Sequence, residues 1–224
     1  MINALKCLVL IPFWLGALVS LLQGAESAEL DDEGWIPLEL DSDTLNTLLS
    51  DVTANGPNLM SLEFTPYRSQ GRLEGCGYSY QVLLKDWAYR SNQPTTVFGS
   101  VVFFAYQDRA PFLSLRIGLT DIEEREGSLW QKNSPPHYAY LRYEEESTAG
   151  EEYSVVDGEE GARNFIYLDP EFEKMAWFLI GESITVAFNR VEGGSDLEFT
   201  IPIMFTEIWE DLGVCFRDLS QIEQ

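Results

Sequence analysis

Histidine is almost missing from this sequence, since His137 is the only one among 224 residues. A Ser–His–Asp triad would have to use His137, which directly follows Pro135 and Pro136. The chain also has no G-x-S-x-G motif, the pattern that marks many serine hydrolases. The sequence also has too few histidines and cysteines for a zinc site, because such sites combine several of these residues. We therefore expect no nucleophilic triad, no zinc centre and no cofactor.

Basic residues are scarce too: 14 Lys and Arg stand against 37 Asp and Glu, which gives a net charge of −23. Proteins that bind nucleic acid neutralise its phosphates with Lys and Arg, and anionic membrane surfaces attract the same side chains. The balance therefore argues against nucleic acid or an anionic membrane as a partner. It is compatible with cationic partners, with metal ions, or simply with high solubility.

Long apolar runs are missing except at the start of the chain. Residues 7–22 form one apolar run, interrupted by a proline and a glycine, and it is shorter than the roughly 20 residues of a membrane-spanning helix. Lys6 precedes the run and small residues follow it, an order typical of a signal peptide. We predict that residues 1–27 are this signal peptide, cleaved after Ser27, with an uncleaved membrane anchor as the alternative.

Cleavage at that point leaves an acidic N-terminal tail over residues 28–34 and a single domain over residues 35–224. It removes one basic and one acidic residue, so the net charge stays at −23. A chain of this length can bury a full hydrophobic core. We expect the mature protein to be periplasmic or secreted, and not to be an integral membrane protein.

Cysteine is also rare, and Cys7 lies inside the predicted signal peptide. Cys76 and Cys215 remain, and an even number in an exported chain indicates a disulfide, because the compartment is oxidising. The alternative is a reactive thiol. Since the chain has no C-x-x-C motif and a Cys–His pair could form only with His137, we predict that the two cysteines are bonded to each other.

Two segments show the period of a helix. Leucines at 45, 48 and 49 and Val52 recur at helical spacing, with Asp41 or Ser42 as the cap and residues 55–57 as the end. A second helix is predicted over residues 169–181, where aspartate and proline begin the segment and glycine ends it. The last segment, residues 206–224, fits either a short helix or a strand.

Most of the remaining apolar residues recur at every second position, which predicts strands. An antiparallel meander is expected from the runs at 77–85, 95–106 and 112–119, preceded by a strand at 59–65 and a turn, and followed by a charged connection at 120–136. Further strands are expected at 137–143, 153–156, 164–168, 183–191 and 197–205. About nine or ten strands with two short helices predict an all-β antiparallel β-sandwich, with a partly open β-barrel as the alternative.

One group of candidate ligand-binding residues follows the end of a predicted strand. Asp86, Trp87 and Tyr89 place an acid beside aromatic rings, an arrangement that can hold a sugar. The alternative is an acid that is simply exposed to water. A wider aromatic set is a candidate binding face, and it consists of Trp87, Tyr89, Trp130, Tyr138, Tyr140 and Tyr143.

A second group of candidates is acidic. Asp157, Glu159 and Glu160 lie within one predicted turn and offer the carboxylate oxygens that calcium prefers. Asp41 and Asp43 form a similar but smaller pair. Neither segment has the D-x-D-x-D-G spacing of an EF-hand loop, and the alternative is an acidic turn surrounded by water.

The second half of the chain carries the pattern DGEEG…LIGESITVAFNRVEGGSDLEFTIPI…VCF. In its placement of strands, glycines and cysteine, it resembles small periplasmic proteins of Gram-negative bacteria, such as invasion-associated locus B proteins and type VI secretion accessory proteins of the TagO kind. The resemblance covers this outline and assigns no role to any residue.

The function hypothesis rests on the export signal, the predicted disulfide and the lack of a catalytic set. We expect a non-enzymatic exported protein that binds an envelope protein or another cell-surface component. The alternatives are a calcium- or carbohydrate-binding module, and a hydrolase that uses two of the many carboxylates.

Overall fold

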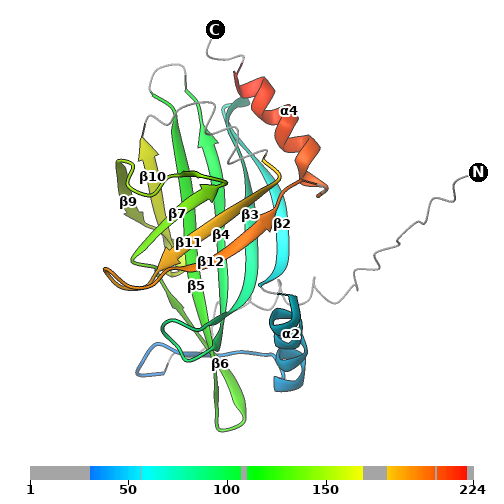
Figure 1. Cartoon of the computed structure of the whole chain (residues 1–224), viewed down its shortest axis with the longest axis vertical. Coiled ribbons are helices and arrows are strands. Elements are labelled where there is room, and N and C mark those ends of the chain that lie inside the picture. The colour runs from blue at the N-terminus through cyan, green and yellow to red at the C-terminus, as the bar shows by residue number, and fades with distance from the viewer. Residues whose placement is uncertain (1–30, 56, 107–109, 169–180, 205, 221–224) are drawn as a thin grey trace, which may run out of the picture.

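A computed structural model describes residues 31–55, 57–106, 110–168, 181–204 and 206–220 of the chain. This described part contains two antiparallel β-sheets and two α-helices (Figure 1). The sheets pack face to face and do not close into a barrel, so the predicted all-β sandwich is confirmed. The predicted signal peptide and residues 169–180 of the predicted second helix lie outside the described residues.

The large sheet has eight strands, in the order β1-β6-β5-β4-β3-β2 with β10 and β9 added beside β5. The long strand β5 changes partner along its length, because residues 112–117 pair with β10 and residues 119–125 pair with β6. The strands are β1 (Ile36–Pro37), β2 (Asn58–Ser69), β3 (Arg72–Asp86), β4 (Gln93–Phe104), β5 (Phe112–Arg125), β6 (Ser128–Ser134), β9 (Tyr153–Asp157) and β10 (Arg163–Leu168).

The small sheet has four strands in the order β12-β11-β7-β8, and its strands cross in front of the large sheet in Figure 1. The strands are β7 (Tyr138–Tyr143), β8 (Glu146–Ser147), β11 (Ser183–Asn189) and β12 (Leu197–Pro202). We call the face of the large sheet that meets the small sheet its inner face, and the opposite one its outer face.

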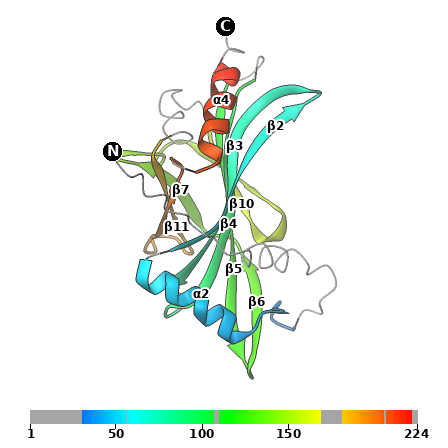
Figure 2. The ribbon, with the colours of Figure 1, turned by 90° about the vertical axis from the view of Figure 1, so that its right-hand side faces the viewer.

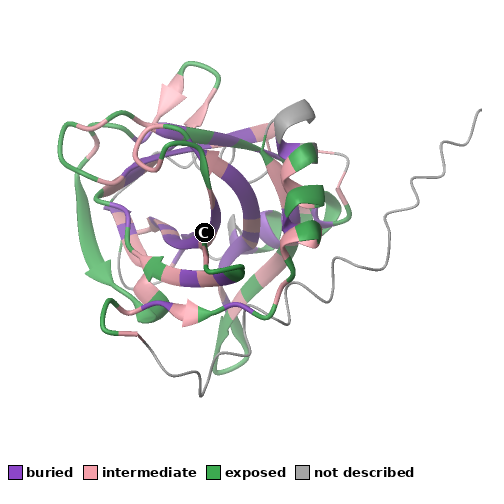
Figure 3. Cartoon of the chain, turned by 90° about the horizontal axis from the view of Figure 1, so that it is seen from below, coloured by how far each residue is buried: buried purple, intermediate pink, exposed green. Residues whose placement is uncertain are grey.

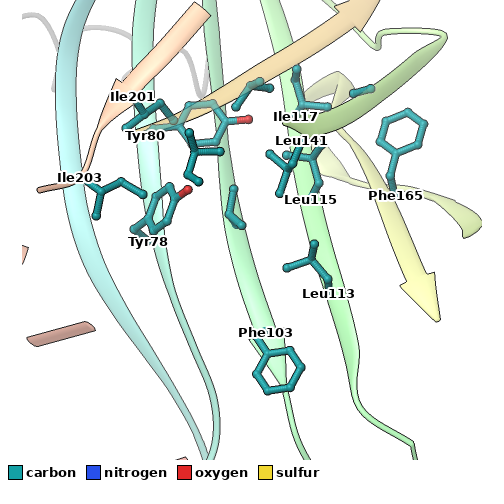
Figure 4. Packing of buried hydrophobic residues seen from close by; sticks show 14 of the residues in the cluster. Tyr78, Tyr80, Phe103, Leu113, Leu115, Ile117, Leu141, Phe165, Ile201 and Ile203 are labelled. Carbon is teal, nitrogen blue, oxygen red and sulfur yellow. The ribbon is translucent and has the colours of Figure 1, made fainter. Parts of the chain in front are cut away.

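The hydrophobic core lies between the two sheets (Figure 4). The predicted alternation is confirmed in β3 and β5, where every second side chain is buried on the inner face, from Tyr78 to Leu84 and from Leu113 to Leu119. Phe188 and Phe199 contribute the facing side of the core from the small sheet. Buried residues follow most of the strands in Figure 3, whereas exposed residues lie at turns, on the outer sides of helices and along the edge strand β9.

The two helices lie toward opposite ends of the molecule (Figure 2). Helix α2 (Ser42–Asn55) packs on the outer face, where Leu45 meets Ile122 and Val52 meets Leu83. Asp41 caps it as predicted, because its carboxylate accepts hydrogen bonds from the Thr44 amide (2.8 Å) and hydroxyl (2.6 Å). These hydrogen bonds lower the pKa of Asp41.

Helix α4 (Ile208–Ser220) packs on the inner face beside the small sheet. Its buried stripe runs from Ile208 through Leu212 to Leu219, at helical spacing, which decides the ambiguous C-terminal segment in favour of a helix. A disulfide joins Cys215 of α4 to Cys76 of β3 across a sequence separation of 139 residues. The predicted disulfide is therefore present, and it fixes the C-terminal helix to the large sheet.

Two predicted boundaries were wrong. Residues 120–136 are not a connection but a hairpin, since β5 continues to Arg125 and turns at Glu126 and Gly127, which both have positive φ, into β6. Strand β2 does not stop at residue 65 but runs through Pro66 to Ser69. A proline is tolerated there because β2 is an edge strand, where a missing N–H breaks no ladder.

The acidic segment before the domain is held in place where the structure describes it. Asp31 accepts a hydrogen bond from the Trp35 amide (2.7 Å) and forms an ion pair with Arg125 (2.8 Å). The Arg125 guanidinium also lies 4.4 Å from the ring centre of Trp35. Residues 31–34 are thus attached to β5. The sequence had instead suggested that they belong to a loose acidic tail.

Candidate binding groove

The outer face of the large sheet is covered by α2 at one end and carries a groove of about 620 Å³ beside it. The groove is lined from strands β1 to β6 and from the short 3₁₀ helix η1 (Glu159–Gly161). The small sheet and α4 pack against the inner face. The groove is the candidate functional site of this protein.

A polar row crosses the floor of the groove. Ser100 of β4 pairs with Arg116 of β5 and with Ser79 of β3, and Ser79 pairs with Glu63 of β2. On its other side, Arg116 pairs with Asn164 of β10. Residues paired across antiparallel strands point to the same face of a sheet, so the five side chains form one row across five strands.

The row beside it brings an aromatic ring into the groove. Phe98 of β4 pairs with Gly118 of β5 and with Gln81 of β3. A Cβ atom at Gly118 would collide with the Phe98 ring, so this glycine lets the ring lie against the backbone of β5. On the same side, Thr120 donates a hydrogen bond to Asn133 of β6 (2.9 Å).

The groove ends at a cluster of aromatic rings on the same outer face. Tyr67, which lines the groove, meets Phe104 edge to face with ring centres 5.1 Å apart. Phe104 stacks on Phe112 at 4.8 Å, and Tyr106 stacks on both. Gly75 makes room for this arrangement, since a Cβ there would lie 2.8 Å from the Phe104 ring.

Arg116 is a cation that lines the groove, and the described part of the chain gives its side chain no partner. Among the residues that the structure describes, its guanidinium makes no ion pair, hydrogen bond or ring contact, and its Nε is buried without an acceptor. Other arginines are engaged by carboxylates, such as Arg142 with Glu198 at 2.7 Å and Arg163 with Asp157 at 2.8 Å. An unpaired arginine is notable in a chain with a net charge of −23.

Asp86 is not the water-exposed acid that the sequence offered as the alternative to a ligand-binding acid. It is completely buried, and its Oδ2 lies 2.6 Å from Nε of Arg190. Arg190 also contacts Asp121 at 2.6 Å, and Arg90 contacts Asp121 at 3.2 Å. Burial, opposed by the charge of Asp121, lowers the pKa of Arg90. This buried charge network joins the large sheet to the segment that follows β11.

Trp87 and Tyr89 lie next to Asp86 but face other surroundings. Trp87 is 61% exposed. The Tyr89 amide donates a hydrogen bond to the Asp86 carboxylate (2.8 Å), and its hydroxyl donates to the Ser195 carbonyl. A sugar site at these residues stays a prediction, but its acid is already engaged by Arg190.

The predicted calcium ligands are not drawn together. Asp157 ends β9 and accepts a hydrogen bond from Arg163 (2.8 Å), whereas Glu159 and Glu160 lie in η1. Within the described part of the chain, no three His, Cys, Asp or Glu side chains form a group that could hold a metal ion. Glu160 instead lines the groove.

The wider aromatic set is divided between the two sheets. Tyr138 and Tyr140 of β7 form a pair with ring centres 5.7 Å apart, while Trp130 lies on β6 of the large sheet. The Tyr140 hydroxyl donates to Asp196 (2.9 Å), and burial together with this hydrogen bond raises the pKa of Tyr140 to about 12. His137, just before β7, is exposed.

Apart from Glu160, the residues that line the groove escaped the sequence analysis. Arg116 and Ser114 lie on the polar side of a strand whose apolar side was predicted correctly. An arginine on that side, in so acidic a chain, is the signal that could have been noticed. The strand register was also needed, because it alone brings Ser79, Ser100 and Arg116 into one row.

Comparisons with protein-family models, with curated proteins and with solved structures find no match for this chain. The resemblance to small periplasmic proteins therefore rests on the outline of the sequence alone.

Among the described residues, no helix has both the length and the apolar character needed to span a membrane. The disulfide between Cys76 and Cys215 is a feature typical of proteins in oxidising compartments.

Proposed function

We propose that this chain is an exported, non-enzymatic binding protein that holds a carbohydrate of the cell envelope or cell surface in the groove. The observation that carries the proposal is the lining of the groove, in which hydroxyl and amide side chains surround the rings of Phe98 and Tyr67. The proposal unites the envelope-binding hypothesis with the carbohydrate-binding alternative.

The lining suits a sugar in two ways. Hydroxyl and amide groups donate and accept hydrogen bonds, as the many hydroxyls of a sugar require, and an aromatic ring offers a flat apolar surface to the C–H groups of a sugar ring. The volume of about 620 Å³ lies within the roughly 300–1,000 Å³ of typical ligand sites. We therefore expect the polar side chains of the groove to bind a sugar rather than to catalyse a reaction on it.

Hydrolysis of the bound sugar is a weaker reading. A glycosidase needs a general acid whose pKa is raised by an apolar environment, with a second carboxylate nearby. The acids that line the groove are Glu63 and Glu160, and both are exposed to water. We therefore propose binding without turnover.

Export is supported by the leader-like start of the chain and by the disulfide. Intact-mass analysis of the protein recovered from the periplasm or medium tests this part. We expect a chain that begins near residue 28 and has no thiol that can be alkylated. A full-length, membrane-bound chain with free Cys76 would contradict it.

Calorimetric titration of the exported protein with a panel of neutral and acidic oligosaccharides tests the binding function. We expect at least one saccharide to bind, and Phe98→Ala to weaken it about tenfold or more, which corresponds to about 1.4 kcal/mol. Trp87→Ala is the matched control, because it removes an exposed ring from the other predicted sugar site.

Two results would contradict the proposal, the first by moving the site and the second by replacing the sugar with a protein ligand. In the first, Trp87→Ala weakens binding while Phe98→Ala does not, which returns the site to residues 86–89. In the second, no saccharide of the panel binds, while crosslinking in the native envelope captures one protein on the outer face.

A further inference from the structure

Arg116 gives the groove a chemical preference that its other lining residues do not. We propose that Arg116 binds an acidic group of the ligand, so that the groove selects a sugar carrying a single oxyanion, a carboxylate or a sulfate, on an otherwise neutral, hydroxyl-rich body. This inference rests on the proposed carbohydrate-binding function and names the class of carbohydrate.

The first argument is that Arg116 lacks a partner within the described part of the protein. Its Nε is buried without a hydrogen-bond acceptor, which is unfavourable for a charged group. A guanidinium presents its N–H donors in a planar fork that matches an oxyanion of two or three oxygens. A bound carboxylate or sulfate would satisfy donors that the folded chain leaves unused.

The second argument is the position of Arg116 in the polar row. On one side of it, Asn164 lies outside the groove lining and its amide donates to the Val156 carbonyl (3.4 Å); on the other side, the hydroxyl groups of Ser79 and Ser100 line the groove. These neutral groups can bind the hydroxyls next to the acidic group without competing for the guanidinium. Arg116 therefore lies beside hydroxyl donors and acceptors suited to the rest of an acidic sugar.

The third argument concerns the number of charges that the ligand can carry. Among the described residues that line the groove, Arg116 is the only cation, and the acids are Glu63 and Glu160. Glu63 lies three strands away in the same row, which is about 14 Å at a strand spacing of about 4.8 Å. At this distance Glu63 does not form an ion pair with Arg116, but its carboxylate repels a second negative charge on the ligand. The net charge of −23 acts in the same direction, so a polyanion is disfavoured.

The test compares matched ligands on matched variants. The probe is a disaccharide of one glucuronic acid and one N-acetylglucosamine. It is titrated beside its carboxyl-reduced, neutral form and beside a disaccharide whose only charged group is one sulfate. The variants are Arg116→Met and Arg142→Met, which make the same change in charge on opposite sheets. Both keep the backbone carbonyl of residue 116 that accepts the Tyr80 hydroxyl.

We expect the wild-type protein to prefer the carboxylate over the carboxyl-reduced form by about tenfold or more, as charge-assisted hydrogen bonds allow. Arg116→Met should remove this preference by weakening the acidic form far more than the neutral form, while Arg142→Met should keep it. If only the sulfated sugar binds more tightly than the neutral form, and Arg116→Met removes that difference, the inference is also supported. The oxyanion is then a sulfate.

Two results would overturn the inference in distinguishable ways. If acidic and neutral forms bind equally, and Arg116→Met changes neither, the groove binds sugar but Arg116 does not select the acid. If neither form binds and the wider saccharide panel also fails, the proposed function falls together with the inference.

Discussion

Arg190 and Arg116 show how the surroundings decide the role of an arginine in this protein. Arg190 lies 2.6 Å from each of two carboxylates, those of Asp86 and Asp121. Arg116 lies in the groove with a buried Nε and no partner among the described residues. The first arrangement satisfies a buried charge and the second leaves a buried N–H without an acceptor, so the two residues should respond to substitution in opposite directions.

Arg190→Met should strongly destabilise the protein. It leaves Asp86 completely buried without its cation, and breaking a buried ion pair from one side costs about 3–5 kcal/mol. Chemical denaturation measures this loss in the free energy of unfolding. Arg142→Met is the control, because its exposed pair with Glu198 is worth at most about 1 kcal/mol. A loss below about 1 kcal/mol for Arg190→Met would show that the network is not structural.

Arg116→Met should leave the melting temperature unchanged or raise it. The substitution removes a buried N–H that has no acceptor and keeps the length of the side chain. Residues kept for binding often reduce stability in this way. Thermal unfolding of the two proteins is the measurement. A melting temperature lower by more than about 4 °C, or about 1 kcal/mol for a domain of this size, would give Arg116 a structural role.

Among the helices and strands, the features that could be predicted are those that depend on the spacing of residues close together in the sequence. The leucine spacing and Asp41 define α2, and alternation defines the buried faces of β3 and β5. The hairpin of β5 and β6 was missed because its charged residues extend beyond the core, where a strand loses its apolar alternation. There Arg125 binds Asp31, a contact between distant segments that no local pattern reveals.

The groove could not be predicted in the same way. Phe98, Arg116 and Tyr67 are far apart in the sequence and meet only through the register of four strands. The burial of Asp86 was missed for a similar reason, since its partner Arg190 follows a strand of the other sheet. Strand faces follow from local alternation, whereas pairing across strands and sheets depends on the whole fold.

The disulfide is the element that most directly fixes α4. Replacing Cys76 and Cys215 together by Ala removes the constraint on a loop of 139 residues, for which chain entropy gives at most about 4–5 kcal/mol. We expect a lower midpoint of chemical denaturation and weaker amide protection in residues 208–220 than elsewhere. Unchanged protection of this helix would mean that the packing of Leu212 and Leu219 suffices without the bond.

At the scale of the whole molecule, stability should fall in alkali. Burial raises the pKa of Tyr78, Tyr80 and Tyr167 above the ordinary value, and that of Tyr140 to about 12. Unfolded tyrosines ionise near pH 10, so their contribution to stability is complete below pH 10 and is lost as the pH rises beyond it.

Tyrosinate absorbance followed beside near-ultraviolet circular dichroism measures this effect. We expect the absorbance of the buried tyrosines to appear only as the tertiary signal is lost, above about pH 10. If all ten tyrosines ionised near pH 10 while the dichroism stayed native, the buried hydroxyls of the core would be more accessible than the packing indicates.

The whole molecule is a sandwich with one covered and one partly open side. The small sheet and α4 protect the inner face of the large sheet, and α2 covers only one end of its outer face. The open part carries polar rows, aromatic rings and an unpaired cation in an acidic protein. Our central claim is that this outer face is the binding surface.

Mapping of amide chemical shifts during titration with the glucuronic acid disaccharide tests this claim most directly. The account predicts that the largest changes fall on the outer-face rows of β3, β4 and β5, at Ser79, Phe98, Ser100 and Arg116, with the small sheet unaffected. Changes centred instead on residues 86–89, or on the small sheet around Tyr138 and Tyr140, would contradict it.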